Sequence, residues 1–167
     1  QKEGKFRKVI FEMLGEGRKL AEYLGEELQA VLIGQNIEDA TTALGEGGAD
    51  KVFLIEDPAL ATYTTDGYAS ALVNLIKAEN PTVVLFPHNA VGKDLAPAVA
   101  QKLNAGQASD VIAIDYEKVL RFKRPIYAGK AFAHVTFTET RPIIVTIRPK
   151  AFEAASPQPG KQPAIVR

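Results

Sequence analysis

Residues 83–103 read VVLFPHNAVGKDLAPAVAQKL, and this stretch decides the fold. Its first five residues, Val83–Pro87, are continuously apolar and too few for a helix, which predicts a buried β-strand. Over Gly92–Leu103 the apolar residues recur at three- and four-residue steps, which predicts a helix, although Pro97 is tolerable only near its first turn. A buried strand followed by a helix indicates an α/β unit built on a parallel sheet.

The same alternation precedes this stretch. Apolar strands of this kind need cover on both faces, and alternating helices supply it through right-handed crossovers. We therefore expect a three-layer αβα sandwich around a mainly parallel sheet. The expected elements are a helix at Arg7–Gly25, a strand at Gln29–Ile33, a helix at Ile37–Leu44, a strand at Lys51–Ile55, a turn at Asp57–Pro58 and a helix at Thr65–Ala78.

After Asn104 the helical period disappears, and short alternating runs predict strands with antiparallel hairpin pairing that complete the same sheet. These strands are expected at Val111–Asp115, Val119–Phe122, Lys130–Thr138 and Ile143–Arg148, with breaks at Tyr127–Gly129 and Glu139–Pro142. The segment Ala151–Pro163 is rich in Ala, Ser, Pro, Gln and Gly, which is typical of a linker. The last four residues, Ala164–Arg167, are interpreted as the beginning of a further segment.

Composition narrows the classes of partner. The 167 residues suit one domain, and 20 basic residues balance 20 acidic ones, which gives no net field to attract nucleic acid or an anionic membrane. No apolar run approaches the length of a membrane span, so we expect a soluble protein. Without cysteine there is no disulfide, thiolate metal site or cysteine nucleophile, which fits a reducing compartment.

The loop after the strand at Val83–Pro87 is a candidate ligand site, because ligands bind at the carboxyl ends of strands in α/β sheets. His88 stands at that end, and Gly92 opens the following helix, where backbone N–H groups and the helix dipole favour anions. The spacing is not that of a P-loop, which would need glycine at Pro87 and serine or threonine at Asp94. Because the Asp94 charge would repel phosphate, a capped helix start is the favoured interpretation.

Other catalytic constellations are missing from the sequence. Neither His88 nor His134 has a second metal-type ligand at helical or hairpin spacing, and no serine lies in a nucleophile-elbow context. We therefore expect neither metal-dependent hydrolysis nor serine catalysis. No catalytic residue is predicted.

A second candidate site is a cluster of basic residues around the stretch Pro125-Ile126-Tyr127-Ala128-Gly129. Arg124 and Lys130 flank an aromatic side chain there, which suits contact with an anionic cofactor or stabilisation of a reduced flavin's negative charge. The structural alternative is a solvated hairpin in which Gly129 makes a tight turn. Both interpretations remain open at the level of sequence.

Several strings together resemble the electron transfer flavoprotein alpha subunit. They are Asp57-Pro58 with Tyr63-Thr64-Thr65-Asp66, Gly92-Lys93-Asp94-Leu95-Ala96-Pro97, Ala108-Ser109-Asp110-Val111, and Arg124-Pro125-Ile126-Tyr127-Ala128-Gly129-Lys130-Ala131. The resemblance runs from about Gly4 to Phe152. Their order and spacing are more specific than any one of them.

The resemblance implies an adenine-nucleotide alpha-hydrolase-like fold that pairs with a beta subunit and forms a base under an FAD domain. It implies residues 1–152 as the N-terminal α/β domain, with a first strand expected before Gln1, and 153–167 as a linker toward a C-terminal FAD-binding domain. FAD would be held by the assembled heterodimer, with AMP or a second FAD in the beta subunit. Flavin dehydrogenases would supply electrons for a quinone reductase or for electron bifurcation, in the cytoplasm of a prokaryote or the mitochondrial matrix of a eukaryote.

The resemblance implies that the chain is an electron-carrier subunit and not an enzyme. Together with the two candidate sites, it gives a set of residues expected to bind a cofactor. Lys130 departs from the family, whose members often carry asparagine there. The candidate cofactor-binding residues are Arg124, Tyr127, Gly129, Lys130, His88 and Gly92.

Two other functions compete with this one. A nucleotide-binding module of the universal-stress-protein type has a comparable sandwich and would bind ATP or AMP, but it needs a glycine-rich loop followed by a helix late in the chain. The residues after Gly129 alternate as a strand does. A hydrolase or ligase of the same broad fold needs a phosphate loop and an acid–base pair, and neither is apparent.

Overall fold

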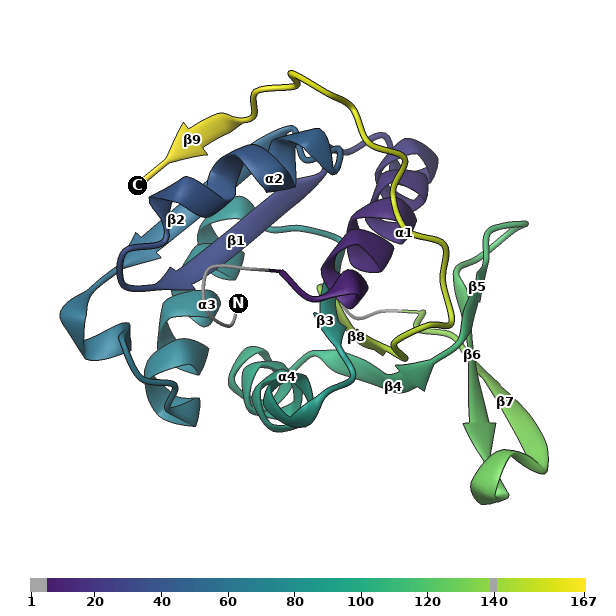
Figure 1. Cartoon of the computed structure of the whole chain (residues 1–167). Coiled ribbons are helices and arrows are strands. Elements are labelled where there is room, and N and C mark those ends of the chain that lie inside the picture. The colour runs from purple at the N-terminus through teal and green to yellow at the C-terminus, as the bar shows by residue number, and fades with distance from the viewer. Residues whose placement is uncertain (1–5, 139–140) are drawn as a thin grey trace. The chain divides into compact units, whose positions relative to one another are not determined.

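The computed structural model describes residues 6–138 and 141–167 and is an α/β fold in which helices flank parallel sheets (Figure 1). It divides into two compact units. The first extends to Tyr68 and includes Glu153–Arg167, and the second spans Ala69–Phe152. The expected α/β class is therefore confirmed, and each unit has its own three-stranded parallel sheet.

The first unit is built on a sheet with the order β1-β2-β9, in which all pairs are parallel. Helix α1 ends where Gly25 adopts a left-handed conformation, with φ of 67°, as expected from a glycine stop signal. The helices and strands are α1 (Lys8–Leu24), β1 (Gln29–Gly34), the 3-10 turn η1 (Glu38–Ala40), α2 (Thr41–Glu46), β2 (Lys51–Glu56), the 3-10 turn η2 (Pro58–Leu60), the start of α3 (Thr65–Glu79) and β9 (Ala164–Val166).

The tail at 153–167, expected to be a linker, is packed against this first unit. Ala155 N–H donates to the Phe11 carbonyl at 2.8 Å, and β9 pairs with β2 (Figure 1). Two glycines make the close approach possible: a Cβ on Gly15 would lie 2.7 Å from the Glu153 carbonyl oxygen, and one on Gly45 would lie 2.4 Å from Pro163 Cδ. The glycine inside α1 therefore makes room for the tail.

The second unit contains a parallel sheet with the order β3-β8-β4 and an antiparallel ribbon with the order β5-β6-β7. All five residues of β8 are buried, as expected of a central parallel strand covered on both faces. The elements are the rest of α3, β3 (Val83–Pro87), α4 (Ala90–Leu103), β4 (Gly106–Val111), β5 (Ala113–Asp115), β6 (Arg121–Ile126), the 3-10 turn η3 (Tyr127–Gly129), β7 (Ala131–Val135) and β8 (Ile143–Ile147).

The strand-rich half differs from expectation in its pairing. Of the four strands expected after Asn104, only the one at Ile143–Arg148, observed as β8, is paired along its whole length in a parallel sheet, while β5, β6 and β7 form a separate antiparallel sheet. The strand expected at Val111–Asp115 is two strands, because a bulge near Asp110 ends β4 and turns the chain into the ribbon. Residues 139 and 140 of the second expected break lie outside the described residues, whereas the break at Tyr127–Gly129 is present.

Helix α4 begins at Ala90, earlier than expected, and contains Pro97 well inside it. The expectation that Pro97 is tolerated only near the first turn is therefore wrong. Proline forfeits one backbone hydrogen bond, but burial of Leu95 and Val99 on either side of it holds the helix against the sheet.

Candidate functional site

The carboxyl ends of β3, β8 and β4 bring together three side chains that are far apart in the sequence. His88 follows β3, Arg148 follows β8, and Asp110 lies in the bulge of β4. Backbone hydrogen bonds fix two of them: His88 N–H donates to the Ile147 carbonyl at 2.8 Å, and Arg148 N–H donates to the Val111 carbonyl at 2.9 Å. In open α/β folds, ligands bind at the carboxyl ends of the parallel strands, which is where these three residues lie.

Thr146, on β8, connects His88 to Asp110. Thr146 is only 1% exposed, and its hydroxyl oxygen accepts the Asp110 backbone N–H at 2.9 Å. The same oxygen lies 2.9 Å from His88 Nδ1. The hydroxyl can donate its hydrogen to Nδ1 or accept a second bond from it, so this contact is compatible with either tautomer of the imidazole. Nε2 faces Asp110 Oδ1 at 3.6 Å.

Asp110 holds Arg148 through two parallel hydrogen bonds. Arg148 Nε donates to Oδ1 at 2.8 Å and Nη2 donates to Oδ2 at 2.6 Å. Asp110 has a positive φ of 59°, a conformation that aspartate tolerates better than most residues. This bidentate pair uses two of the five N–H groups of an arginine, so the Arg148 guanidinium keeps donors for another acceptor.

The electrostatics of the cluster follow from these contacts. The hydrogen bond from Arg148 lowers the pKa of Asp110, against the opposing effect of burial. Burial lowers the pKa of His88; Asp110 opposes that shift, while the charges of Lys93, Arg148 and Arg124 reinforce it. A pKa below 6.5 leaves the His88 imidazole mainly neutral near pH 7.

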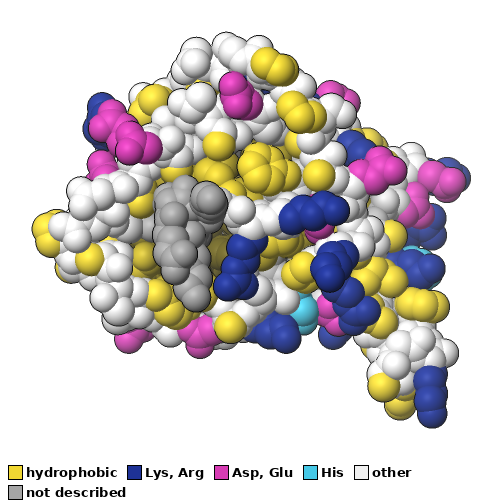
Figure 2. Space-filling model, in the orientation of Figure 1, with side chains coloured by type: hydrophobic (Ala, Val, Ile, Leu, Met, Phe, Trp, Pro, Cys, Tyr) yellow, Lys and Arg dark blue, Asp and Glu magenta, His cyan; other side chains and the backbone are white. Residues whose placement is uncertain are grey.

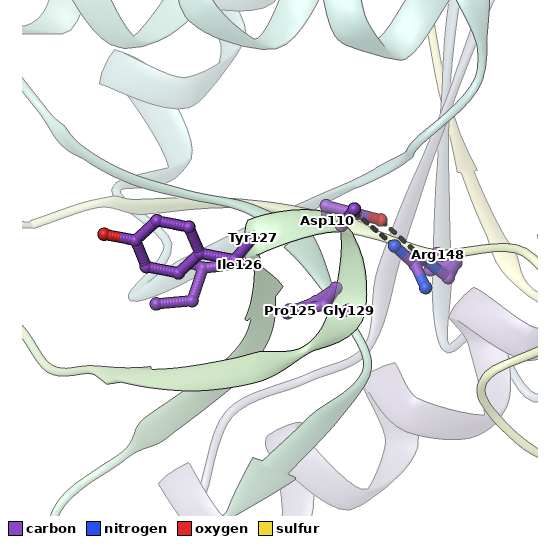
Figure 3. A pocket seen from close by; sticks show the side chains of 7 residues that line it. Asp110, Pro125, Ile126, Tyr127, Gly129 and Arg148 are labelled. Atoms are coloured by element: carbon purple, nitrogen blue, oxygen red, sulfur yellow. Dashed lines mark hydrogen bonds and ion pairs between the residues drawn. The ribbon is translucent and has the colours of Figure 1, made fainter.

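A pocket of about 280 Å³ opens beside the Asp110–Arg148 pair. Its other wall is the β6–η3 segment. Figure 3 shows the ion pair at one side of the pocket and the side chains of Ile126 and Tyr127 at the other. The lining residues are Asp110, Pro125, Ile126, Tyr127, Ala128, Gly129 and Arg148.

Arg124 lies on the inner face of the ribbon. It stands two residues after the fully buried Phe122 in β6 and so lies on the same face of the strand, and its charge acts on both Asp110 and His88. Among the described residues, its Nε is a buried nitrogen with no hydrogen-bond partner. Such a donor costs about 1–3 kcal/mol unless a ligand satisfies it. Figure 2 shows Lys and Arg side chains around a histidine on the visible face.

The turn η3 at the end of the ribbon displays an aromatic side chain. Tyr127, Ala128 and Gly129 all have positive φ, at 49°, 53° and 85°, and Tyr127 is 80% exposed. Left-handed conformations cost a non-glycine residue about 1–2 kcal/mol. Strain of this kind clusters at functional sites.

The structure brings four of the six sequence-derived candidates to this region. His88 belongs to the polar cluster, Arg124 lies next to it, and Tyr127 and Gly129 line the pocket. Lys130 is exposed and does not line the pocket.

Gly92 serves the start of helix α4. Its N–H donates to the Asn89 side-chain oxygen at 2.9 Å, which is the capped helix start that the sequence favoured. A Cβ at this position would lie 1.7 Å from the Pro87 carbonyl oxygen, so only glycine fits.

Sequence reasoning missed Asp110, Thr146 and Arg148. Asp110 and Arg148 stand at strand ends, the same signal that singled out His88, but the strand order that brings them together was unknown. Thr146 sits within an apolar strand and carries no signal of its own. Within the described residues no cluster of three metal-ligating side chains occurs, and no helix has the length and apolarity to cross a bilayer.

Comparison with known proteins gives consistent matches. The electron transfer flavoprotein domain matches residues 1–167. The chain is 40% identical to the electron transfer flavoprotein subunit alpha of Bacillus subtilis over 166 residues, which cover 98% of this chain and 50% of that protein. It is 34% identical to the corresponding subunit of Megasphaera elsdenii, over 99% of this chain and 50% of that one.

A differently named relative is the acryloyl-CoA reductase electron transfer subunit beta of Anaerotignum propionicum. It is 33% identical, over 93% of this chain and 49% of its own length. The chain thus spans about half the length of the curated relatives it matches.

Proposed function

Because the chain belongs to the electron transfer flavoprotein domain family, we propose that it is the N-terminal scaffold of an alpha-type subunit. In this proposal it pairs with a beta subunit and helps position FAD for electron transfer. The match over the whole chain to relatives named as electron transfer flavoprotein subunit alpha carries the proposal. Electron transfer itself belongs to the flavin, and the protein supplies binding, orientation and electrostatics.

The division of the chain is part of the proposal. Residues 1–152 make up most of the α/β domain, with a further strand proposed before Gln1. The segment 153–167 adds β9 to the first sheet and is proposed to lead toward a C-terminal FAD-binding domain. A flavin dehydrogenase is the electron donor in a simple shuttle to a quinone reductase. The similarity to an electron transfer subunit of acryloyl-CoA reductase supports an electron-transfer role, and flavin-based bifurcation is the other mode that we propose.

The ribbon is the segment that we propose to face a flavin. Arg124 offers a buried guanidinium nitrogen without a partner among residues 6–138 and 141–167, and Tyr127 and Gly129 line a pocket near it. A cation close to a reduced flavin stabilises the anionic form and raises its reduction potential. His88 adds a neutral imidazole behind the pocket, while Lys130 and Gly92 are assigned weaker, peripheral roles.

The subunit assignment is tested by purification of the native protein. We expect it to co-purify with a beta subunit and to show the absorbance of an oxidised flavin. A colourless homodimer that binds ATP would overturn the assignment.

The flavin-facing role is tested by Arg124→Ala in the assembled protein. We expect the reduction potential of one flavin to fall, since the cation that favours the reduced anion is gone. Arg121→Ala is the matched control, because Arg121 lies on the same strand and pairs with Asp115 away from the pocket. Equal potentials in the two variants, with flavin content intact, would leave only the hairpin interpretation.

The universal-stress-protein hypothesis receives no support from this geometry. Its phosphate loop should follow a strand and lead into a helix. Here Gly129 joins two antiparallel strands, and β7 follows it.

A further inference from the structure

His88 and Arg148 approach the same carboxylate, but only Arg148 is bonded to it. Arg148 Nε donates to Asp110 Oδ1 at 2.8 Å, and Nη2 donates to Oδ2 at 2.6 Å. His88 Nε2 lies 3.6 Å from Oδ1, which is too long for a hydrogen bond. A charge-assisted bond between these two atoms would measure about 2.7–2.9 Å, so the ring needs to approach by less than about 1 Å to make one.

The Asp110 carboxylate has room for this second bond. Its two oxygens offer about four lone-pair sites, and Arg148 occupies one site on each oxygen. Oδ1 therefore keeps a site for His88 Nε2 while both bonds from Arg148 remain. The side chains of His88 and Asp110 are each 20% exposed, so solvent only partly screens the attraction between an imidazolium and the carboxylate.

Thr146 provides an acceptor for the other ring nitrogen. Its hydroxyl oxygen accepts the Asp110 N–H and lies 2.9 Å from His88 Nδ1. A hydroxyl oxygen has two lone pairs, so it can also accept a proton carried by Nδ1. A charged imidazole is a donor at both nitrogens, and it would have an acceptor on each side: Thr146 at Nδ1 and Asp110 at Nε2.

The charge of His88 changes in a mildly acidic range. Burial lowers its pKa, and the Asp110 carboxylate on β4 raises it. The cations Lys93 on α4, Arg148 after β8 and Arg124 on β6 lower it further, so that the pKa lies below 6.5. Near pH 7 the ring is therefore mainly neutral, and acidification adds the second proton.

Asp110 stands where the parallel sheet continues into the ribbon. It lies in the bulge near the end of β4, and β5, the first strand of the ribbon, begins at Ala113. It also lines the pocket whose other wall is the β6–η3 segment (Figure 3). A bond from His88 to this carboxylate would tie the carboxyl end of β3 to the base of the ribbon.

We infer that His88 is a proton-dependent latch on Asp110. When the imidazole is neutral, Arg148 alone holds the carboxylate. When the imidazole is charged, Nε2 donates to Oδ1, and one carboxylate links the carboxyl ends of β3, β4 and β8. Mild acid thereby fixes the base of the ribbon and the polar side of the pocket. The inference goes beyond the proposed function, because the latch consists of side chains of this chain and needs no flavin.

The direct test compares crystal structures of the native protein, with its accompanying subunits, at about pH 8 and about pH 5. We expect the distance from His88 Nε2 to Asp110 Oδ1 to shorten from 3.6 Å to about 2.8 Å in acid, with both Arg148 bonds kept. The same distance at both pH values would overturn the inference. So would a shortened distance accompanied by loss of the Arg148 bonds.

An NMR titration of the histidine signals, with only this chain isotopically labelled, measures the coupling between His88 and Asp110. In Asp110→Asn the pKa of His88 should fall, because the carboxylate that raises it is gone. Asparagine also tolerates the positive φ at this position. Asp115→Asn is the matched control, since Asp115 likewise pairs with an arginine, and it should leave the His88 titration unchanged. Equal His88 pKa values in the two variants would contradict the latch.

A second variant keeps the test decisive if Asp110→Asn does not fold. Thr146→Val removes the acceptor that a charged ring needs at Nδ1, so the pKa of His88 should fall in this variant too. Thr146→Ser keeps the hydroxyl and should titrate as the native protein does. An unchanged pKa in Thr146→Val would show that the ring is not held between two acceptors.

Discussion

Asp50 in the first unit and Asp110 in the second each hold an arginine, but they use it differently. Asp50 accepts from Arg18 Nη2 at 2.8 and 2.9 Å, from Lys161 Nζ at 2.8 Å and from the Leu28 N–H at 2.9 Å. Arg18 and Lys161 also donate to the carbonyl of Gly48. In the Asp50 cluster, both cations therefore donate to acceptors within the chain. Lys161 thereby connects the C-terminal tail to the residues that precede β2.

Asp110, by contrast, takes two bonds from one arginine and leaves the remaining donors beside a pocket. A second arginine, Arg124, lies near and has a buried nitrogen without a partner in the described part of the chain. The comparison teaches that an ion pair says little about its role by itself. Whether the cation's other donors are used within the fold distinguishes a structural pair from a candidate binding site.

The largest effect is expected from Asp50→Asn. This change removes the negative charge that two cations and one backbone N–H share, so we expect the free energy of unfolding to fall by about 2–3 kcal/mol. Urea denaturation measures it, and hydrogen exchange should show faster exchange in β9. Asp115→Asn, at an exposed pair, is the control and should leave the midpoint almost unchanged. An equal effect of both substitutions would contradict the structural role of Asp50.

The pH dependence of the unfolding free energy gives a second test of the structural role of Asp50. Burial alone would raise the pKa of Asp50, but hydrogen bonds from Arg18, Lys161 and the Leu28 N–H outweigh it and lower the pKa to about 2. A carboxylate with a lowered pKa stabilises the fold above its ordinary value of 3.8, and this stability is lost as the pH falls toward 2. We expect about 1–2 kcal/mol to disappear over that range. The loss should be smaller in Asp50→Asn, and an unchanged acid profile there would refute the assignment.

Thr146→Val tests the support beneath the second cluster. Valine has nearly the same shape but cannot accept the Asp110 N–H, so we expect a loss of about 1–1.5 kcal/mol in unfolding free energy. The His88 ring also loses its contact at Nδ1. Thr146→Ser keeps the hydroxyl and is the control for that contact. If valine and serine behave alike, the hydroxyl does not hold Asp110.

The smallest effect on stability is expected from Arg148→Ala. The Arg148 side chain is 47% exposed, and pairs of this kind contribute less than about 1 kcal/mol. The informative measurement is the pKa of His88 by NMR titration. Removing a nearby cation and leaving Asp110 unpaired both favour the charged imidazole, so the pKa should rise. Arg121→Ala should leave the His88 titration unchanged, and a fall of the pKa in Arg148→Ala would contradict the cluster.

Local pattern was sufficient for elements with a strong hydrophobic period. The strand Val83–Pro87 has the expected bounds, and helix α1 ends at the expected glycine. The strand β9 could not be found in this way, because its three residues are exposed and follow a segment rich in proline. Its position depends on non-local partners: β2, and the Asp50 carbonyl that accepts the Ala164 N–H at 2.9 Å.

Some residues of the candidate site could be predicted from local sequence, and others could not. His88 was predicted from its place after a strand, and Arg124, Tyr127 and Gly129 from the composition of one segment. Asp110 was missed as a site residue because its conformation depends on a β-bulge, and the local residue pattern does not predict that bulge. Arg148 was missed because nothing in the sequence says which strand lies beside β4.

The α/β alternation, the basic residues of the ribbon and the family resemblance follow from the sequence alone, because hydrophobic period, glycine stops and ordered strings are local properties. The position of β8 between β3 and β4, which brings His88, Asp110 and Arg148 together at the carboxyl ends of the strands, is apparent only in the folded chain. Strand order depends on which apolar surfaces pack together across long separations, and that information is not contained in any single segment.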